Sequence, residues 1–417
     1  MSLKWKTAGY FQNKAYLIPY MTQTKSYPYI LFTFSFLSVA LGAMNSVLAP
    51  AYLPDILKDL QGSSGSMPSD NAGAWINFTF LAGTTMGGIL LSFISDHTGR
   101  KKSLVFSLLL CGIGCGLGAL CTSWQQLAAT RFVVGIGVGT ALVISTVVLS
   151  ETWALRTKAI ALGILSVAYP VGIIGSGIIT YFIPHWQTAL LIGILPCALV
   201  IPAILLLEES YKPHAPLVGE EKISLMTHYK PLLSGMVVYG TMLIGLWSAF
   251  AWLPTFVESL KGDPALDSFT QRGLAVTFLG LGGLIGGICS GWFANKFGTR
   301  QVQAVCFILC FLGSLFLFKM NKSFGVDILI GSGLLGLCFG VSQGVLNILI
   351  PSLFPVQLRS SGTGLCFHVG RAFTAIAVFF TGVWAIRLGG YGNAIFIFSF
   401  VYLLGLFALL IRKYATY

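Results

Sequence analysis

The sequence predicts an all-α integral membrane protein with twelve transmembrane helices in two pseudo-symmetric halves of six. Hydrophobic residues make up 55% of the 417 residues and charged residues only 9%, against about 25% charged residues in soluble proteins. Apolar runs of about 20 residues, each long enough to cross a bilayer, recur along the chain. Glycines and basic residues of the first half also recur at matching positions in the second half. The runs are continuous rather than alternating, which excludes a transmembrane β-barrel.

The chain begins with a basic segment, residues 1–27, that lacks an apolar core followed by a small-residue cleavage site. We therefore expect a cytoplasmic tail and not a removable signal peptide. The first half, 28–207, contains predicted spans at 28–52, 72–94, 103–123, 126–149, 159–183 and 186–207. A polar cytoplasmic linker at 208–230 precedes the second half, 231–411, with spans at 231–256, 274–294, 302–318, 327–350, 361–385 and 391–411. Residues 412–417 form a second cytoplasmic tail.

The two halves repeat each other at an offset near 200 residues. Four pairs match at an offset of 201: Gly135 with Gly336, Gly139 with Gly340, Lys158 with Arg359, and Gly163 with Gly364. Several landmarks at one spacing indicate a duplicated six-helix unit.

The distribution of cations predicts the orientation. Most of the 25 Lys and Arg residues fall in the tails, the linker and the loops of one side. Short cytoplasmic loops are enriched in these residues, so we expect a multi-pass inner or plasma membrane protein with both termini in the cytoplasm. The net charge of +12 is then explained by topology and by contact with anionic lipid. No soluble domain remains to bind nucleic acid.

The loop from Asp96 to Lys102 joins a carboxylate, a glycine and three consecutive cations between two apolar runs. Asp-x-x-Gly-Arg-Lys at this place resembles the signature loop of the major facilitator superfamily, with Ser92 in place of the first glycine of the signature. The stretch from Arg131 to Gly139 resembles the fourth span of sugar and organic-acid porters. The segment from Cys366 to Arg371 resembles metabolite–proton symporters for aromatic acids, sialic acid and lactate. The resemblance implies two parallel halves around a midplane substrate site.

The resemblance also implies a charge network that holds an inner gate shut. Its members in this sequence are Asp96, Gly99, Arg100, Glu151, Arg156 and Arg359. The positive N-terminal dipole of the eleventh span is a suitable partner for Asp96. A purely topogenic role for these charges remains the alternative.

Arg371 is the leading candidate for substrate binding. Twelve residues after Arg359, at about 1.5 Å each, place it roughly 18 Å into the membrane. An Arg at this depth costs about 2.5–3.5 kcal/mol, and no carboxylate lies at comparable depth in any predicted span. Such an Arg is suited to hold a substrate carboxylate through two parallel hydrogen bonds. The alternative is a structural Arg bonded to backbone carbonyls.

Two further ionisable residues lie inside predicted spans. His368 precedes Arg371 by three residues and shares its helix face, so it is a candidate proton carrier; a neutral hydrogen-bonding or packing role is the alternative. In the resembling porters, the residue matching Arg131 works opposite a first-span Asp that carries the proton. This first span offers only Asn45. Arg131 therefore serves an anionic ligand or extends to the outer surface.

The other candidate pocket residues are polar and neutral, or aromatic: Asn45, Gln343, Asn347, Tyr239, Trp247 and Trp252. Aromatic faces with a few amides suit a ring-bearing organic acid, and also a sugar. Trp252 could instead belong to the interfacial aromatic belt.

The sequence lacks a nucleophile–base pair, a phosphate loop and a metal-ligand cluster, so we predict neither an enzyme nor a bound cofactor or metal. The preferred interpretation is a monomeric secondary transporter that moves a small organic anion by alternating access, coupled to protons. Alternatives are an exporter of a drug or carboxylate siderophore, a neutral sugar porter, and a sensor that binds without turnover. The Asp96–Arg100 gate, useful only for alternating access, disfavours the sensor.

Overall fold

The computed structural model describes residues 27–61, 69–91, 94–95, 98–153, 157–209, 228–355 and 358–411. Within these residues the regular structure is helical, apart from one isolated β-bridge between Lys261 and Ser323. Twelve helical segments in the described part are long and apolar enough to cross a membrane. The predicted fold class is therefore confirmed.

The first half contains six spans and one short extra helix. Its helices are α1 (Tyr27–Ala51), α2 (Leu53–Gln61), α3 (Ser69–Met86), α5 (Arg100–Gly118), α6 (Trp124–Thr152), α7 (Lys158–Phe182), α8 (Trp186–Ile192), α9 (Leu195–Ala198) and α10 (Val200–Leu206). A π-helical turn, Gly87–Leu91, extends α3. The sixth span is divided into α8, α9 and α10, with Pro196 at the start of α9, where its missing N–H is tolerated.

The second half repeats this arrangement without a counterpart of α2. Its helices are α11 (Tyr229–Ser259), α12 (Ser268–Phe297), α13 (Thr299–Ser314), α14 (Val326–Leu349), α15 (Arg359–Val383), α16 (Tyr391–Phe398) and α17 (Val401–Ile411). A π-helical turn, Leu315–Met320, extends α13, and a short 3-10 turn, Pro351–Leu353, follows α14. The predicted linker at 208–230 lies mostly outside the described residues.

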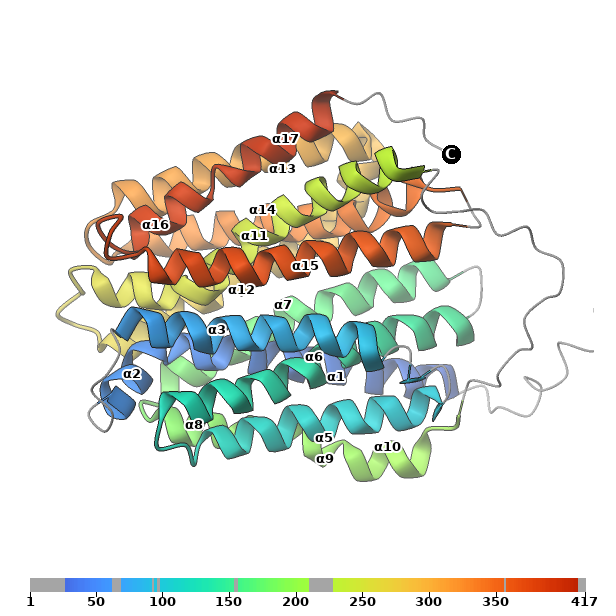
Figure 1. The fold of residues 1–417 in the computed structure, drawn as a ribbon, viewed down its shortest axis with the longest axis horizontal. Coiled ribbons are helices and arrows are strands. Elements are labelled where there is room, and N and C mark those ends of the chain that lie inside the picture. The colour runs from blue at the N-terminus through green and yellow to red at the C-terminus, as the bar shows by residue number, and fades with distance from the viewer. Residues whose placement is uncertain are drawn as a thin grey trace, which may run out of the picture.

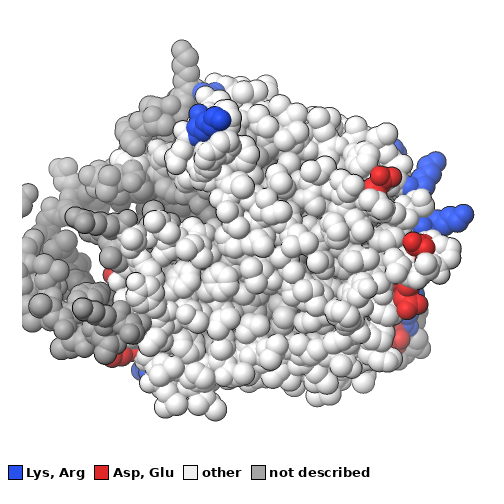
Figure 2. All heavy atoms as spheres, turned by 180° about the vertical axis from the view of Figure 1, so that it is seen from behind, with Lys and Arg blue, Asp and Glu red and all other residues white. Residues whose placement is uncertain are grey.

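Charged side chains gather at the two ends of the molecule. Figure 2 shows a broad uncharged band between them, as the hydrocarbon core of a membrane requires. Helix α1 begins and α17 ends at the same end, called here the terminus-bearing end, and α2 lies at the opposite, distal end (Figure 1).

Glycines at repeated positions hold the helices of each half together. A β-carbon on Gly139 of α6 would lie 2.1 Å from the carbonyl oxygen of Thr84 on α3. On the matching Gly340 of α14, it would lie 2.2 Å from the carbonyl oxygen of Gly283 on α12. Both contacts allow two backbones to approach more closely than any side chain permits. The sequence repeat therefore corresponds to equivalent packing in space.

The halves meet where α7 packs against α12, α3 against α15 and α1 against α11. Helices α7 and α12 are in backbone contact at the distal end, where a β-carbon on Gly273 would lie 2.8 Å from the carbonyl oxygen of Gly177. Near the middle, a β-carbon on Gly283 would lie 3.6 Å from the Pro170 ring. The spacing between these two helices therefore increases away from the distal end.

The same trend continues to the terminus-bearing end. A β-carbon on Gly163 of α7 or on Gly291 of α12 would meet no atom of the described residues within 4 Å. Gly364, near the start of α15, has the same open surroundings. The two halves are therefore closed against each other at the distal end and diverge toward the terminus-bearing end.

Alanine at two glycines of the first half should test this packing. We expect Gly139→Ala to destabilise the protein by about 1–3 kcal/mol, because its methyl group overlaps the α3 backbone. Gly163→Ala is the matched control and should leave stability unchanged or slightly raised. Thermal unfolding of both variants in detergent measures the difference; equal melting temperatures would contradict the described helix contact.

Candidate functional site

Arg371 lies in the middle of the 25-residue α15, and its guanidinium reaches the first half. A β-carbon on Gly88, in the π-helical turn that extends α3, would lie 3.5 Å from Nη1 of Arg371 and 3.1 Å from Cε1 of His368. The absence of a side chain at Gly88 therefore lets both residues of α15 approach α3. His368 is half-buried, and its Nδ1 has no hydrogen-bond partner in the described part of the chain.

Tyr239 brings α11 to the same point. A close crossing of α11 and α15 at Gly240 and Gly370, where a β-carbon on Gly240 would lie 3.3 Å from Cα of Gly370, sets the spacing. The Tyr239 ring stacks on Phe367 with centroids 4.3 Å apart. Its buried side chain lies within electrostatic range of Arg371.

Tyr169 completes the group from the first half, and sequence reasoning missed it. This residue of α7 lies within electrostatic range of both Arg371 and Arg131. Its ring meets Trp247 of α11 edge to face, at 6.3 Å between centroids. A signal was available, because a polar aromatic residue in mid-span precedes Pro170, the repeat counterpart of Arg371. We call Arg371, His368, Tyr239, Tyr169 and Trp247 the central site.

Arg131 is committed to the backbone of α1. Its Nη1 donates to the carbonyl oxygen of Asn45 at 2.7 Å, and its Nη2 donates to that of Ser46 at 2.9 Å. The guanidinium also lies 4.3 Å from the centroid of the Phe80 ring. With 2% of its surface exposed, Arg131 does not extend to the membrane surface, which was one of its two expected roles. It ties α6 to α1 beside the central site.

Two expected pocket residues are engaged in packing. The Asn45 amide donates to the carbonyl oxygen of Gly193 at 2.8 Å and to Sγ of Cys111 at 3.3 Å, inside the first half. Trp252 is fully buried, and its indole nitrogen donates to the carbonyl oxygen of Val378 at 3.1 Å. Its ring stacks on Tyr391. Trp252 therefore seals α11 against α15 and is not part of an interfacial belt.

The two amides of α14 differ in their surroundings. Gln343 is half-buried, and its Nε2 has no hydrogen-bond partner among the described residues. Asn347 is exposed near the end of α14. Gln343 is therefore the better placed of the two to meet a ligand.

Two of the expected gate residues, Arg100 and Glu151, form an ion pair within the first half. Arg100, 7% exposed, donates from Nη1 to Ser95 Oγ at 2.5 Å and from Nη2 to Glu151 Oε1 at 3.1 Å. Gly99 has φ 106°, a conformation that side chains rarely adopt. Asp96 and Arg156 lie outside the described residues, as does the side chain of Arg359.

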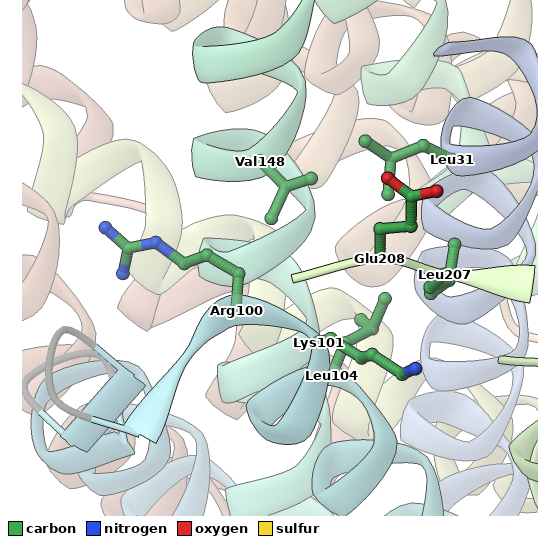
Figure 3. A pocket seen from close by; sticks show the side chains of 7 residues that line it. All are labelled: Leu31, Arg100, Lys101, Leu104, Val148, Leu207 and Glu208. Atoms are coloured by element: carbon green, nitrogen blue, oxygen red, sulfur yellow. The ribbon is translucent and has the colours of Figure 1, made fainter. Parts of the chain in front are cut away.

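Glu209 joins this ion pair in a charge cluster. It accepts a hydrogen bond from the backbone N–H of Lys101 at 3.2 Å, and a β-carbon on Gly99 would overlap its carboxylate. Figure 3 shows the small apolar pocket beside this cluster, with Arg100 directed away from Glu208. Its volume of about 10 Å³ is at the lower limit for holding a single water molecule, so it is a packing gap and not a ligand site.

Comparison with known proteins identifies the family. The model of the Major Facilitator Superfamily matches residues 34–366. The sialic acid transporter NanX of Escherichia coli (strain K12) is 28% identical over 324 residues, which cover 75% of this chain and 77% of NanX. The 4-hydroxybenzoate transporter PcaK of Pseudomonas putida is 25% identical over 353 residues, covering 74% and 76% of the two chains. The inward-open xylose transporter XylE from E. coli superimposes with a TM-score of 0.74 at 15% identity, covering 93% of this chain and 96% of XylE.

Arg131 and Arg371, which both lie inside spans, should respond differently to substitution. We expect Arg131→Gln to lower the free energy of unfolding by about 3 kcal/mol, because two carbonyl oxygens of α1 lose charged donors. Arg371→Gln should cost much less stability, because its guanidinium faces the gap between the halves. Thermal unfolding of both variants in detergent provides the comparison, and an equal loss of stability would assign Arg371 a structural role as well.

Proposed function

Because the chain belongs to the major facilitator superfamily, we propose that it is a secondary active transporter that moves a small organic anion by alternating access. The single observation that carries the proposal is Arg371, a mid-helix cation at the junction of the halves. In the part of the chain that the structure describes, every Asp and Glu lies in a loop or near a helix end, so none matches its depth. A substrate carboxylate is the partner that compensates this charge.

The surroundings of Arg371 favour a substrate with a ring. Tyr239 and Tyr169 lie within electrostatic range of the guanidinium, and Phe367 and Trp247 contact their rings. The names of the relatives agree with this chemistry, because 4-hydroxybenzoate and sialic acid are both ring-bearing carboxylates. One chain contains the whole central site, which supports a monomer as the transporting unit.

We place both termini in the cytoplasm. Lys101, Lys230 and Arg300 are among the cations at the terminus-bearing end, and cations predominate on the cytoplasmic side of membrane proteins. In this orientation, the divergence of α7 and α12 opens the central site toward the cytoplasm. The structure then corresponds to an inward-facing state of the transport cycle.

We assign proton coupling to His368. The Nδ1 of His368, which has no hydrogen-bond partner among the described residues, and the nearby Arg371 guanidinium support this assignment. A protonated His368 and the nearby Arg371 guanidinium repel each other, and a bound carboxylate offsets this repulsion. Proton and substrate anion therefore favour each other's binding, which is the thermodynamic requirement for symport.

Exchange of labelled 4-hydroxybenzoate across proteoliposomes should require Arg371. We expect Arg371→Gln to lower the apparent affinity by roughly 30-fold or more, since truncating a buried charge pair costs about 2 kcal/mol or more. The neutral isostere 4-hydroxybenzamide should compete poorly with 4-hydroxybenzoate for the wild-type protein. Because exchange detects importers and exporters alike, exchange of sugars but not of carboxylates would overturn the anion proposal.

A pH gradient tests the coupling separately. An acidic exterior should accelerate uptake by the wild-type protein, and His368→Asn should abolish the acceleration while retaining exchange at equal pH. Gradient-insensitive uptake by the wild type would remove His368 as the coupling site and leave the role of Arg371 intact.

A further inference from the structure

Helix α2 covers the distal end of the junction between the halves. It is too short to cross the membrane, with nine residues. Leu53, Ile56, Leu57 and Leu60 form its buried apolar side. A β-carbon on Gly73 of α3 would lie 3.2 Å from Leu53 and 3.5 Å from a ring atom of Trp252 in the second half. The helix is therefore packed into the closed distal end.

The polar side of α2 is joined to the second half by ion pairs. Nζ of Lys58 lies 3.0 Å from Oε1 of Glu258, near the end of α11. Asp55 accepts a short hydrogen bond from Nη2 of Arg272, near the start of α12. Nε of Arg272 lies 3.7 Å from Oε2 of Glu258, and Ser268 also donates to that carboxylate.

Arg272 is the centre of this cluster. Its side chain is 1% exposed, whereas those of Asp55 and Glu258 are 28% and 21% exposed. A desolvated guanidinium requires its carboxylate partners, since removal of one leaves a buried charge uncompensated. One of these partners, Asp55, belongs to the first half. The buried charge of Arg272 is therefore fully compensated only while the halves are closed at the distal end.

An apolar seal lies next to the ion pairs. Trp75 and Phe78 of α3 meet Phe379 of α15 edge to face, with ring centroids 4.9 and 5.6 Å apart. The Trp252 ring packs against Gly382, whose β-carbon would lie 3.0 Å from Cβ of Ala74. Polar and apolar contacts thus close the same end.

The charge cluster at the other end has a different connectivity. Arg100 and Glu151 both belong to the first half, so their pair stays intact however the halves move. A pair locks the junction only when its partners belong to different halves, as in Lys58–Glu258 and Asp55–Arg272.

We propose that Asp55, Lys58, Glu258 and Arg272 form the distal gate of the transport cycle, and that its ion pairs between the halves break whenever the central site opens to the distal side. The proposal rests on alternating access by this chain and is independent of substrate identity. Loss of a pair then shifts the protein toward the distally open state.

Labelling of a cysteine at Ala74 tests the gate. Ala74 is fully buried beside Trp252, and Cys121, at the same end, is replaced by Ser in every variant. A membrane-impermeant maleimide is added from the distal side of membrane vesicles. We expect Asp55→Asn and Arg272→Gln each to raise the labelling rate of Ala74→Cys about tenfold. The double variant should label only slightly faster than Arg272→Gln alone, because both substitutions remove the same Asp55–Arg272 pair.

Two controls make the test decisive. Lys319→Gln removes a distal cation whose partner, Asn393, lies in the same half, so labelling should not change. Lys58→Gln removes an ion pair whose cation is exposed and should raise the labelling rate by a smaller factor. This variant leaves the buried Arg272 in place, so it tests the gate even if the Arg272→Gln protein misfolds. Unchanged labelling in both Asp55→Asn and Lys58→Gln overturns the gate. Because labelling needs no substrate, this outcome is separable from a failure of 4-hydroxybenzoate exchange.

Discussion

The hydrocarbon core of the membrane tolerates a charge only where a partner compensates it, and this constraint organises the whole molecule. Among the described residues, carboxylates are confined to loops and to positions near helix ends, whereas the cations Arg131 and Arg371 lie inside the spans. Arg131 is compensated by two carbonyl oxygens of α1. Arg371 lies at the junction of the halves, where we propose that a substrate anion provides the compensating charge. One arginine therefore supports the fold, while the other is available to a ligand.

The sequence was sufficient to predict the spans and the repeat, because hydropathy and recurring glycines reflect forces that act on single helices and helix pairs. It was insufficient for Arg131, since backbone carbonyl acceptors leave no trace in the sequence. The distal ion pairs were equally hidden, with Asp55 and Arg272 separated by 217 residues. Helix α2 was missed because its nine residues fall below the length that a hydropathy pattern detects. The roles of the central site and the gate remain proposals.

The two ends of the molecule use charge differently. At the terminus-bearing end, Arg100 pairs with Glu151 and the backbone N–H of Lys101 donates to Glu209, and these residues all precede the second half. At the distal end, Arg272 depends on residues of both halves. The pairs at the terminus-bearing end stabilise the first half alone, whereas the pairs at the distal end form only when the two halves are in contact. The same residue types therefore serve rigidity at one end and switching at the other.

The glycines along α7 and α12 have a consequence for the conformation opposite to the one described. Gly163 and Gly291 have no neighbour within 4 Å of an added β-carbon among the described residues, so their small size brings no packing advantage against these residues in this state. If the halves rock as rigid bodies, these two positions become the crowded ones, as Gly177 and Gly273 are now. A bulky residue at Gly163 would then prevent the halves from closing at the terminus-bearing end. The binding site would stay accessible from that side of the membrane only. Such a trapped molecule would present a single conformation to an inhibitor or an antibody.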